Sequence, residues 1–324
     1  MYSRIAGTGS YLPDKVVTNA DLEKIMDTTD EWIRTRTGIE RRHIAADGQT
    51  TVDLAEHAAR RAIEAAGVSP SEIDFIVFGT TTPDVVFPNC GVLLQARLGA
   101  RGCPAFSVET ACSGFIYALS IADKFIKAGE AKCALVVGSE TLSRITNWND
   151  RSTAVLFADG AGAVVLKPSA EPGLMSTHLH ADGAYKDLLY VDQGVSKGFT
   201  ADPVTNKVKI GIRMAGSEVF KIAVQKLGGA VDEALAANGL EKSAVNWLIP
   251  HQANIRIITA MAKRLELPME RVIVTVQDHG NTSTASVPLA LDTGVRDGRV
   301  KRGDLLLLEA FGGGFTWGSA LVRF

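Results

Sequence analysis

Three polar residues that are far apart in the sequence have the chemistry needed for acyl transfer, and Cys112 is the first. It lies in residues 109–115 (ETACSGF), at the expected start of a helix running to about residue 128. A helix N-terminus favours negative charge, so this position is expected to lower the thiol pKa. Because thiolates attack thioester carbonyls, Cys112 is the candidate acyl-accepting nucleophile. A structural role suits the other cysteines better, namely Cys90, Cys103 and Cys133.

The other two residues are His251 and Asn281. His251 follows an apolar run in residues 249–254 (IPHQAN), where Pro250 ends a strand before the next helix opens. Asn281 lies in residues 278–283 (DHGNTS), where its amide can cap a helix or donate to a developing oxyanion. Both roles for Asn281 stay open. The three consecutive glycines in residues 310–315 (AFGGGF) allow a close backbone approach and suit an oxyanion hole better than a phosphate loop.

An internal duplication indicates which elements position these residues. Residues 61–67 (RAIEAAG) and 71–77 (SEIDFIV) recur in degenerate form at 233–239 and 243–249, an offset of 172. Residues 118–129 and 287–298 are similar helical patterns whose closing glycines are 169 apart. An offset of 169 relates Cys112 to Asn281, which predicts that both begin equivalent helices. An offset of 172 relates Gly79 to His251, just after equivalent strands.

The alternation of helices with continuously apolar strands predicts sheets buried on both faces. The fold class is therefore α/β, with a layered αβαβα body built from two duplicated halves. Residues 1–170 form the half with the nucleophilic cysteine, and residues 171–324 form the half with the histidine and asparagine. Residues 182–214 fit neither repeat and are expected to be loops and short strands inserted over the core.

Composition excludes several classes of protein. The chain has 324 residues, 46% of them hydrophobic and 22% charged, with a formal net charge of -2. These values are typical of a soluble enzyme and argue against a nucleic-acid binder. There is no signal-peptide pattern and no run of 18 apolar residues, and no two cysteines form a C-x-x-C pair. We therefore expect a cytoplasmic protein with free thiols, no membrane contact and no metal site.

The motifs and their order resemble the beta-ketoacyl-acyl-carrier-protein synthase III family of thiolase-like condensing enzymes. The resemblance spans essentially the whole chain, through residues 7–13 (GTGSYLP), 30–33 (DEWI), 35–38 (TRTG), 111–114 (ACSG), 159–162 (DGAG), 250–254 (PHQAN), 279–283 (HGNTS) and 308–324 (LEAFGGGFTWGSALVRF). Related elongation enzymes use a second histidine where this chain has Asn281. The asparagine is typical of the initiating branch, which is primed by acyl-CoA.

The resemblance implies a homodimer with the five-layered thiolase fold and a decarboxylating Claisen condensation. Cys112 would take an acyl group from acyl-CoA, and malonyl-acyl carrier protein would follow, giving 3-ketoacyl-acyl carrier protein and initiating fatty acid biosynthesis. His251 and Asn281 would stabilise the enolate formed as CO2 departs. The amides of Cys112 and Gly313 would form the oxyanion hole, and no metal or other cofactor is expected.

The resemblance also implies where the substrates bind. Coenzyme A would contact Trp32, Arg36 and Arg151, although each could instead be an ordinary surface cation or a packed aromatic residue. Phe87 matches the loop that closes the acyl pocket of the partner subunit. Glu109 departs from the small residue expected there, and an inward carboxylate would raise the thiol pKa. We expect Glu109 to point away from the sulfur.

Docking of the acidic carrier protein would fall on Arg256, supported by Lys221, Lys263 and Arg264. Positions 256, 263 and 264 share one helical face because they are spaced by seven and eight residues. The alternative is an ordinary solvated basic face.

Three other functions share these residue types. A related enzyme of secondary metabolism, of polyketide or quinolone type, would have the same Cys-His-Asn triad and a different acyl group. A Cys-His-Asn hydrolase lacks its expected cysteine signature here. A non-catalytic acyl-CoA-binding scaffold would not need all three polar residues.

Overall fold

The computed structural model describes residues 1–198 and 211–324, in which two open sheets dominate. The first sheet has the strand order β1 (Tyr2–Tyr11), β7 (Asp159–Ser169), β6 (Ala134–Thr141), β4 (Phe75–Gly79) and β5 (Ala105–Val108). The second has the order β11 (Trp247–Pro250), β12 (Leu305–Gly312), β13 (Thr316–Arg323) and β8 (Leu174–Ala181). Two small antiparallel pairs join β2 (Lys15–Thr18) to β3 (Arg41–Ile44) and β9 (Leu189–Val191) to β10 (Ile212–Met214).

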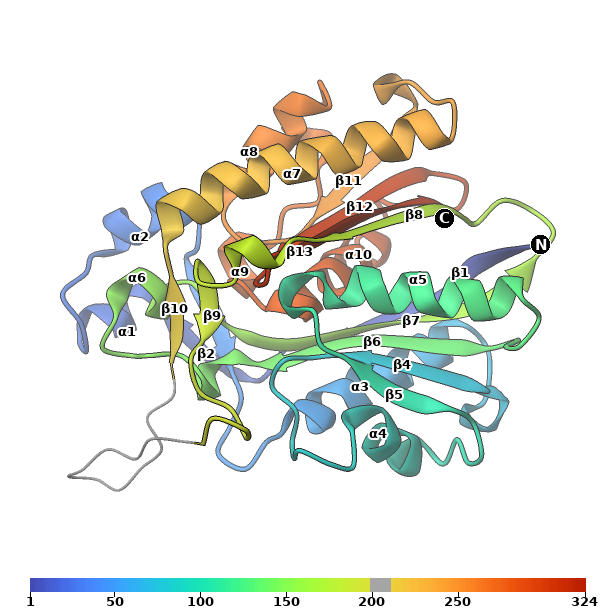
Figure 1. Ribbon diagram of the computed structural model, residues 1–324, viewed down its shortest axis with the longest axis horizontal. Coiled ribbons are helices and arrows are strands. Elements are labelled where there is room, and N and C mark those ends of the chain that lie inside the picture. The colour runs from blue at the N-terminus through green and yellow to red at the C-terminus, as the bar shows by residue number, and fades with distance from the viewer. Residues whose placement is uncertain (199–210) are drawn as a thin grey trace.

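Helices lie on both sides of each sheet, so the body has five layers (Figure 1). α3 (Thr51–Ala65) and α4 (Cys90–Leu98) cover the outer face of the first sheet. α5 (Gly114–Lys127) and α10 (Ser286–Arg296) fill the space between the sheets. α7 (Gly216–Ala237) and α8 (Ile255–Arg264) cover the outer face of the second sheet. The predicted αβαβα class is therefore confirmed.

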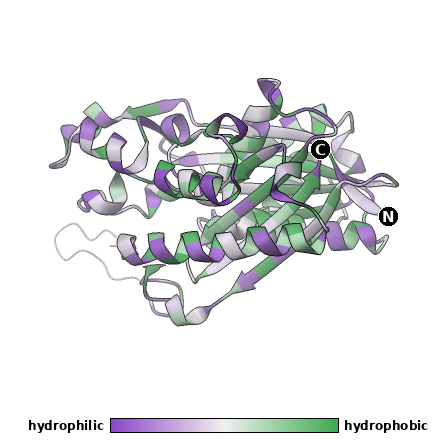
Figure 2. Cartoon of the chain, turned by 90° about the horizontal axis from the view of Figure 1, so that it is seen from above, coloured by the Kyte–Doolittle hydropathy of each residue, from purple (hydrophilic) through white to green (hydrophobic). Residues whose placement is uncertain are grey.

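Shorter helices and turns complete the chain. They include α1 (Asn19–Glu23), α2 (Asp30–Thr37), α6 (Arg151–Ala154) and α9 (Val276–His279), and the 3-10 turns η2 (Ala111–Ser113) before α5 and η7 (Ser283–Ala285) before α10. The hydropathy of the residues follows the layers. The central strands are mostly hydrophobic, and hydrophilic and hydrophobic residues alternate along the outer helices (Figure 2). None of the helices among the described residues is long and apolar enough to cross a membrane.

The local sequence accounts for these elements. Every residue of β6 and of β12 is buried, as expected for strands covered by helices on both faces. α3 begins with a capping box in which Thr50 and Asp53 satisfy each other's backbone amides. α5 and α10 lack a side-chain cap, and each begins directly after its 3-10 turn. Those two turns hold the residues of greatest chemical interest.

The two sheets repeat the same arrangement. The order β1-β7-β6-β4, with its antiparallel and parallel pairings, recurs as β8-β13-β12-β11. The turns η2 and η7 also correspond, because Ala111 and Ser283 both have positive φ, at 47° and 50°. Ala111 and Ser283 are 172 residues apart.

This correspondence corrects one sequence-based prediction. Asn281 is not the counterpart of Cys112, because Cys112 lies two residues before α5 and Asn281 lies five residues before α10. The counterpart is Thr284, at an offset of 172. The offset of 169 came from the helix ends, and it fails at the helix starts because α5 has 14 residues and α10 has 11.

The expected insertion over the core contains β9 and β10 and a 3-10 turn at Gly183–Tyr185. Ile212 donates its backbone N–H to the carbonyl of Ile145, which ties β10 to the segment before α6. Residues 199–210 of the predicted insertion lie outside the described residues.

Candidate active site

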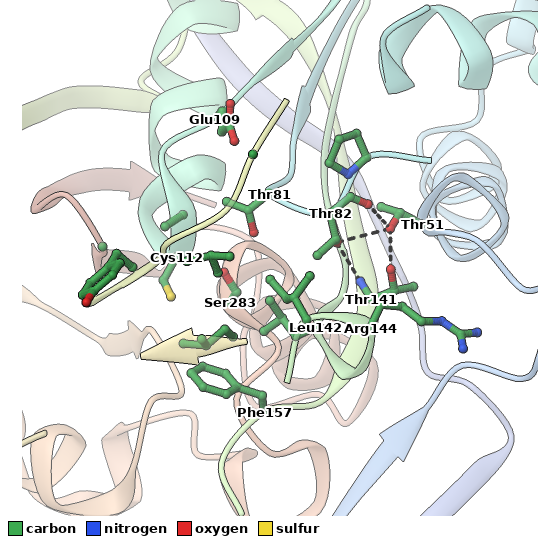
Figure 3. A pocket seen from close by; sticks show the side chains of 18 of the residues that line it. Thr51, Thr81, Thr82, Glu109, Cys112, Thr141, Leu142, Arg144, Phe157 and Ser283 are labelled. Carbon is green, nitrogen blue, oxygen red and sulfur yellow. Dashed lines mark hydrogen bonds between the residues drawn. The ribbon is translucent and has the colours of Figure 1, made fainter. Parts of the chain in front are cut away.

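A cavity of about 1180 Å³ opens beside the first turn of α5. Its wall includes Cys112 and Ser283 from the two equivalent turns, Gly313 from the hairpin between β12 and β13, and Leu189 from β9. Figure 3 shows the Cys112 sulfur facing into this space from one side. All four cysteines lie in the described residues, and Cys112 is the one that lines this cavity.

Close packing fixes the turn that carries Cys112. A Cβ added to Gly312 would lie 2.7 Å from the Cys112 amide nitrogen, so only glycine allows β12 to approach this backbone. On the same side, the carbonyl of Thr110 accepts hydrogen bonds from the hydroxyls of Ser113 (2.7 Å) and Thr316 (2.9 Å). The glycine-rich segment therefore places its backbone directly beside the candidate nucleophile.

The thiol is not activated in the way its sequence position suggested. Burial raises the pKa of Cys112 to about 12, and an ionised carboxyl at the nearby Glu140 would act in the same direction. Hydrogen bonds from Ser283 and from the residue's own amide lower the pKa by less. The expectation of a lowered pKa was wrong because α5 begins only at Gly114 and desolvation of a buried thiolate outweighs the field of the helix.

His251 lies immediately after β11 and is buried. Its amide donates to the carbonyl of Glu309 (2.8 Å), and its Nδ1 lies 2.5 Å from the hydroxyl of Ser286 at the start of α10. Burial lowers the pKa of His251 to about 3, so the imidazole is neutral at physiological pH. A neutral ring with one nitrogen occupied has its other nitrogen left for substrate.

Asn281 is buried in the segment between α9 and η7. Its side-chain oxygen accepts from the amide of Ser283 (2.9 Å), and its backbone pairs with Leu156 and Ala158 at 2.9 Å each. This local bond resembles the capping role that the sequence left open beside an oxyanion role. The side-chain oxygen of Asn281 makes this local bond, while its NH2 group can donate to an oxyanion. The two roles are therefore compatible.

The three predicted residues come from different layers of the fold, and each belongs to or contacts residues 281–286. The Ser283 side chain hydrogen-bonds the Cys112 thiol, and the Ser283 amide donates to the side-chain oxygen of Asn281. Three residues later, Ser286 holds the His251 ring. Residues 281–286 thus link the nucleophile to both candidate oxyanion donors.

Glu109 lies at the rim of the same cavity and is exposed. In Figure 3 its carboxylate stands well away from the Cys112 sulfur. The expectation that it points away from the nucleophile is therefore confirmed, and Glu109 faces the mouth of the cavity instead.

The residues predicted to bind coenzyme A also come together. The guanidinium carbons of Arg36 and Arg151 lie 4.8 Å and 5.0 Å from the centre of the Trp32 ring. Trp32 and Arg36 come from α2, whereas Arg151 comes from α6 and anchors on the carbonyl of Asp27 at 2.7 Å. The cluster combines a flat aromatic surface with two exposed cations, which suits a phosphorylated nucleotide.

The predicted basic face lies on two packed helices. Arg256, Lys263 and Arg264 are exposed on α8, and Lys221 is exposed on the neighbouring α7. Arg256 lies 5.0 Å above the ring of Phe220. Arg264 forms an ion pair with Asp232, so its charge is partly neutralised within the chain.

Phe87 is 84% exposed and does not line this chain's own cavity. Its neighbours Val85 and Val86 do line the cavity, yet they are 46% and 69% exposed. The loop therefore forms an apolar protrusion beside the cavity mouth.

Comparison with known proteins identifies the family. Residues 106–183 match the model described as 3-oxoacyl-(acyl-carrier-protein (ACP)) synthase III, and residues 235–324 match the model of its C-terminal part. A beta-ketoacyl-(acyl-carrier-protein) synthase III of Xanthomonas campestris pv. campestris is 65% identical over 100% of this chain and 99% of the relative. The chain belongs to the 3-oxoacyl-(acyl-carrier-protein) synthase III family.

Solved structures of this synthase family agree with the fold. The 3-oxoacyl-(acyl-carrier-protein) synthase III of Aquifex aeolicus VF5 is similar at 48% identity, with a TM-score of 0.92 over 99% of this chain and 100% of the other. The priming beta-ketosynthase from the R1128 polyketide biosynthetic pathway is similar at 40% identity, with a TM-score of 0.93 over 99% and 96%. The chain is therefore similar in fold to both enzymes.

Sequence reasoning missed four polar residues that surround the synthase site. Ser283 and Ser286 contact the thiol and the imidazole, and Thr284 and Glu140 lie behind the nucleophile. A correct offset of 172 would have identified Thr284. A glutamate inside the apolar run of β6 was a further signal, because buried strands rarely contain one.

Proposed function

We propose that this chain catalyses the decarboxylating Claisen condensation of an acyl-CoA primer with malonyl-acyl carrier protein. The products are 3-ketoacyl-acyl carrier protein, coenzyme A and CO2, and the reaction initiates fatty acid biosynthesis. The observation on which this rests is the Cys112 thiol in a cavity of about 1180 Å³, hydrogen-bonded to the segment that also holds His251 and Asn281. Full-length identity of 60–65% to curated synthases favours this function over a polyketide or quinolone role.

Acyl transfer comes first. The Cys112 sulfur forms a bond to the acyl carbon, the bond from that carbon to the CoA sulfur breaks, and the CoA sulfur gains the proton that Cys112 loses. The amides of Cys112 and Gly313 are the proposed donors to the tetrahedral oxyanion. Their proximity is supported by the backbone of Gly312, which packs directly against the Cys112 amide.

Condensation follows on the acyl-enzyme. The malonyl group loses CO2, and the enolate carbon attacks the acyl carbonyl while Cys112 leaves as a thiolate and takes a proton. His251 and Asn281 would donate to the thioester oxygen on which negative charge develops. Both side chains are buried, so these hydrogen bonds would act in a site with little competing water.

The contacts around His251 support protonation at Nε2. The amide of Gln252 donates to the Ser286 hydroxyl at 3.3 Å, which leaves the single proton of that hydroxyl for Nδ1 at 2.5 Å. With Nδ1 accepting, a neutral ring has its proton on Nε2 and can donate it towards an enolate oxygen. Ser286 is therefore a proposed positioning residue.

The substrates would bind on two surfaces. The Trp32 cluster with Arg36 and Arg151 is the proposed coenzyme A site, through ring stacking and phosphate contacts. Arg256 is the proposed centre of carrier-protein docking, supported by the exposed cations of α7 and α8, Lys221, Lys263 and Arg264. An acidic partner would be attracted to that face.

A homodimer is the proposed assembly. β5 is an edge strand of the first sheet, and an unpaired edge favours pairing with another chain. The apolar loop formed by Val85, Val86 and Phe87 is exposed in the single chain, which is typical of an interaction surface. Phe87 would then close the acyl pocket of the partner. Sedimentation of the wild type and of Phe87→Asp would test this, and a monomeric wild type would contradict it.

Two further proposals concern the chain as a whole. Residues 1–170 and 171–324 are proposed as the duplicated halves, which the recurring strand order supports. A cytoplasmic location with no metal or other cofactor is proposed from the reaction class. Among the described residues, no three or more His, Cys, Asp or Glu side chains are grouped so that they could hold a metal ion.

The proposed reaction is tested by incubating the protein with radiolabelled acyl-CoAs of graded length and malonyl-acyl carrier protein. We expect labelled 3-ketoacyl-acyl carrier protein from the wild type and no labelled product from Cys112→Ser. A labelled acyl-enzyme that gives no condensation product would contradict the synthase function. It would favour an acyl-binding or acyl-transfer role.

A further inference from the structure

Thr284, the counterpart of Cys112, sits in a socket made by three glycines of the first half. A Cβ added to Gly79 or Gly138 would lie 2.7 Å or 2.5 Å from atoms of Thr284, and one added to Gly114 would lie 2.9 Å from its hydroxyl. Thr284 is 1% exposed, so the socket is closed to solvent. The second half therefore inserts one hydroxyl directly behind the turn that carries the nucleophile.

That hydroxyl has two oxygen neighbours and a single proton. Thr284 Oγ1 lies 2.7 Å from the carbonyl oxygen of Ala111 and 3.0 Å from Oε1 of Glu140. A carbonyl can only accept, so the threonine proton goes to Ala111. The contact at 3.0 Å is then a hydrogen bond only if Glu140 supplies the proton, because two oxygens that both lack one would repel each other.

The surroundings of Glu140 suit a neutral acid. The side chain is fully buried on β6, and its contacts among the described residues are hydroxyls and an amide rather than a cation. Oε2 accepts from the hydroxyls of Thr82 (2.6 Å) and Thr80 (3.2 Å). The amide and the hydroxyl of Thr81 lie 3.1–3.2 Å from both carboxyl oxygens. Burial raises the pKa of Glu140, against the smaller opposing effect of these hydrogen bonds.

Two thiols lie close enough to Glu140 to be affected by its charge. Burial raises the pKa values of Cys112 on η2 and Cys90 on α4, and an ionised Glu140 would raise both further. A negative charge on Glu140 would therefore oppose formation of the Cys112 thiolate. A neutral acid would not.

The bond to the Ala111 carbonyl also stabilises an unfavourable backbone. Ala111 has φ 47°, in the left-handed region that is unfavourable for any residue other than glycine. The next residue is Cys112, so the direction of the thiol depends on this turn. Losing the Thr284 bond would allow Ala111 to relax to a more common conformation and would turn the sulfur away.

We propose that Glu140 is a positioning residue for the nucleophile, held as a neutral carboxylic acid that donates from Oε1 to Thr284, which in turn donates to the Ala111 carbonyl. This relay fixes the turn without placing a negative charge beside the thiolate. The relay rests on the proposed role of Cys112, but the protonation state of Glu140 can be measured without any substrate.

Glu140→Gln tests the charge, because a glutamine can donate to Thr284 from its NH2 and accept from Thr82 at its oxygen. The pKa of Cys112 is read from the pH dependence of its alkylation by iodoacetamide, with the labelled peptide quantified by mass spectrometry. We expect the same Cys112 pKa in the wild type and in Glu140→Gln. A lower pKa in the variant would mean that an ionised carboxylate had been removed, and this would overturn the proposal.

Infrared spectroscopy of the wild type provides a second measurement if the variant folds poorly. The difference spectrum against Glu140→Gln should show a protonated carboxylic acid C=O band that persists at neutral pH. A carboxylate band in its place would contradict the neutral acid. Neither measurement needs acyl-CoA, so failure of the relay is distinguishable from failure of the synthase function.

The positioning role is tested at Thr284. Thr284→Val keeps the shape and removes the proton, and we expect acyl transfer to Cys112 to fall about 10- to 100-fold, in line with the cost of misplaced reacting groups. Thr284→Ser should restore most of the rate because it keeps the hydroxyl. Equal rates in Thr284→Val and the wild type would refute the relay.

Discussion

The turns that precede α5 and α10 have the same backbone but opposite tasks. Each begins with a non-glycine residue at positive φ, Ala111 at 47° and Ser283 at 50°, and each leads into a helix between the sheets. The first turn places the Cys112 thiol against the cavity, whereas the second packs Thr284 into the socket of the three glycines. One duplicated element thus provides the proposed nucleophile and the other its support.

The comparison teaches that equivalent positions share a backbone rather than a chemistry. Asn281 and His251 act, in our proposal, from segments beside the second turn and not from the position equivalent to Cys112. Ser283 and Ser286 provide the bonds that connect these segments.

The largest effects are expected at the oxyanion donors of the second half. His251→Ala or Asn281→Ala should slow decarboxylation of malonyl-acyl carrier protein about 100- to 1000-fold, the usual cost of removing an oxyanion donor. Acyl transfer to Cys112 should be spared by comparison. Release of 14CO2 and labelling of the enzyme are measured in parallel, and a greater loss of acyl transfer than of decarboxylation would contradict the assigned roles.

Gly312→Ala tests the packing behind the first turn. Its Cβ would lie 2.7 Å from the Cys112 amide, and we expect a loss of about 1–3 kcal/mol in the free energy of unfolding together with slower acyl transfer. Gly229→Ala on α7 is the matched control, because no atom lies within 4 Å of its added Cβ. Urea unfolding of both variants checks this, and similar stability in the two would show that Gly312 is not constrained.

A smaller, pH-dependent effect is expected at Glu309, a buried glutamate of the second sheet. Its carboxyl oxygens have no hydrogen-bond partner among the described residues, and burial raises its pKa to about 8. The folded state therefore keeps a proton that the unfolded chain loses at about pH 4.5. Stability should fall as pH rises from about 4.5 to 8, at up to about 1.4 kcal/mol per pH unit.

Glu309→Gln removes this titration while keeping the shape of the side chain. Urea unfolding at a series of pH values should show a flatter profile for Glu309→Gln than for the wild type between pH 5 and pH 8. Parallel profiles would mean that Glu309 is ionised in the folded protein, and the assignment of a raised pKa would be wrong.

The smallest effect is expected when the second turn is given the residue of the first. In a Cys112→Ala background, Thr284→Cys places a thiol at the equivalent position, but that position does not line the cavity. We expect no acylation from labelled acyl-CoA, and the same background with Thr284 unchanged is the control. Labelling of residue 284 would show that the two turns are chemically interchangeable.

Much of this architecture could be predicted from the sequence, because it depends on local patterns. Continuous apolar strands, helix-ending glycines and the repeat indicated the five layers and the position of Cys112. The thiol pKa could not be predicted, since it depends on burial by distant segments. The roles of Thr284 and Glu140 could not be predicted either, because these two residues are 144 positions apart in the sequence and meet only in the folded protein.

Cys112 is the proposed acceptor of the acyl group, and mapping the site of acylation tests this role most directly. The wild type is incubated with acyl-CoA alone, digested at low pH to preserve the thioester, and mapped by tandem mass spectrometry. We predict one acyl group on the peptide containing Cys112 and none on the peptides containing Cys90, Cys103 or Cys133. An acyl group on another residue, or an unmodified Cys112 after complete reaction, would contradict the account.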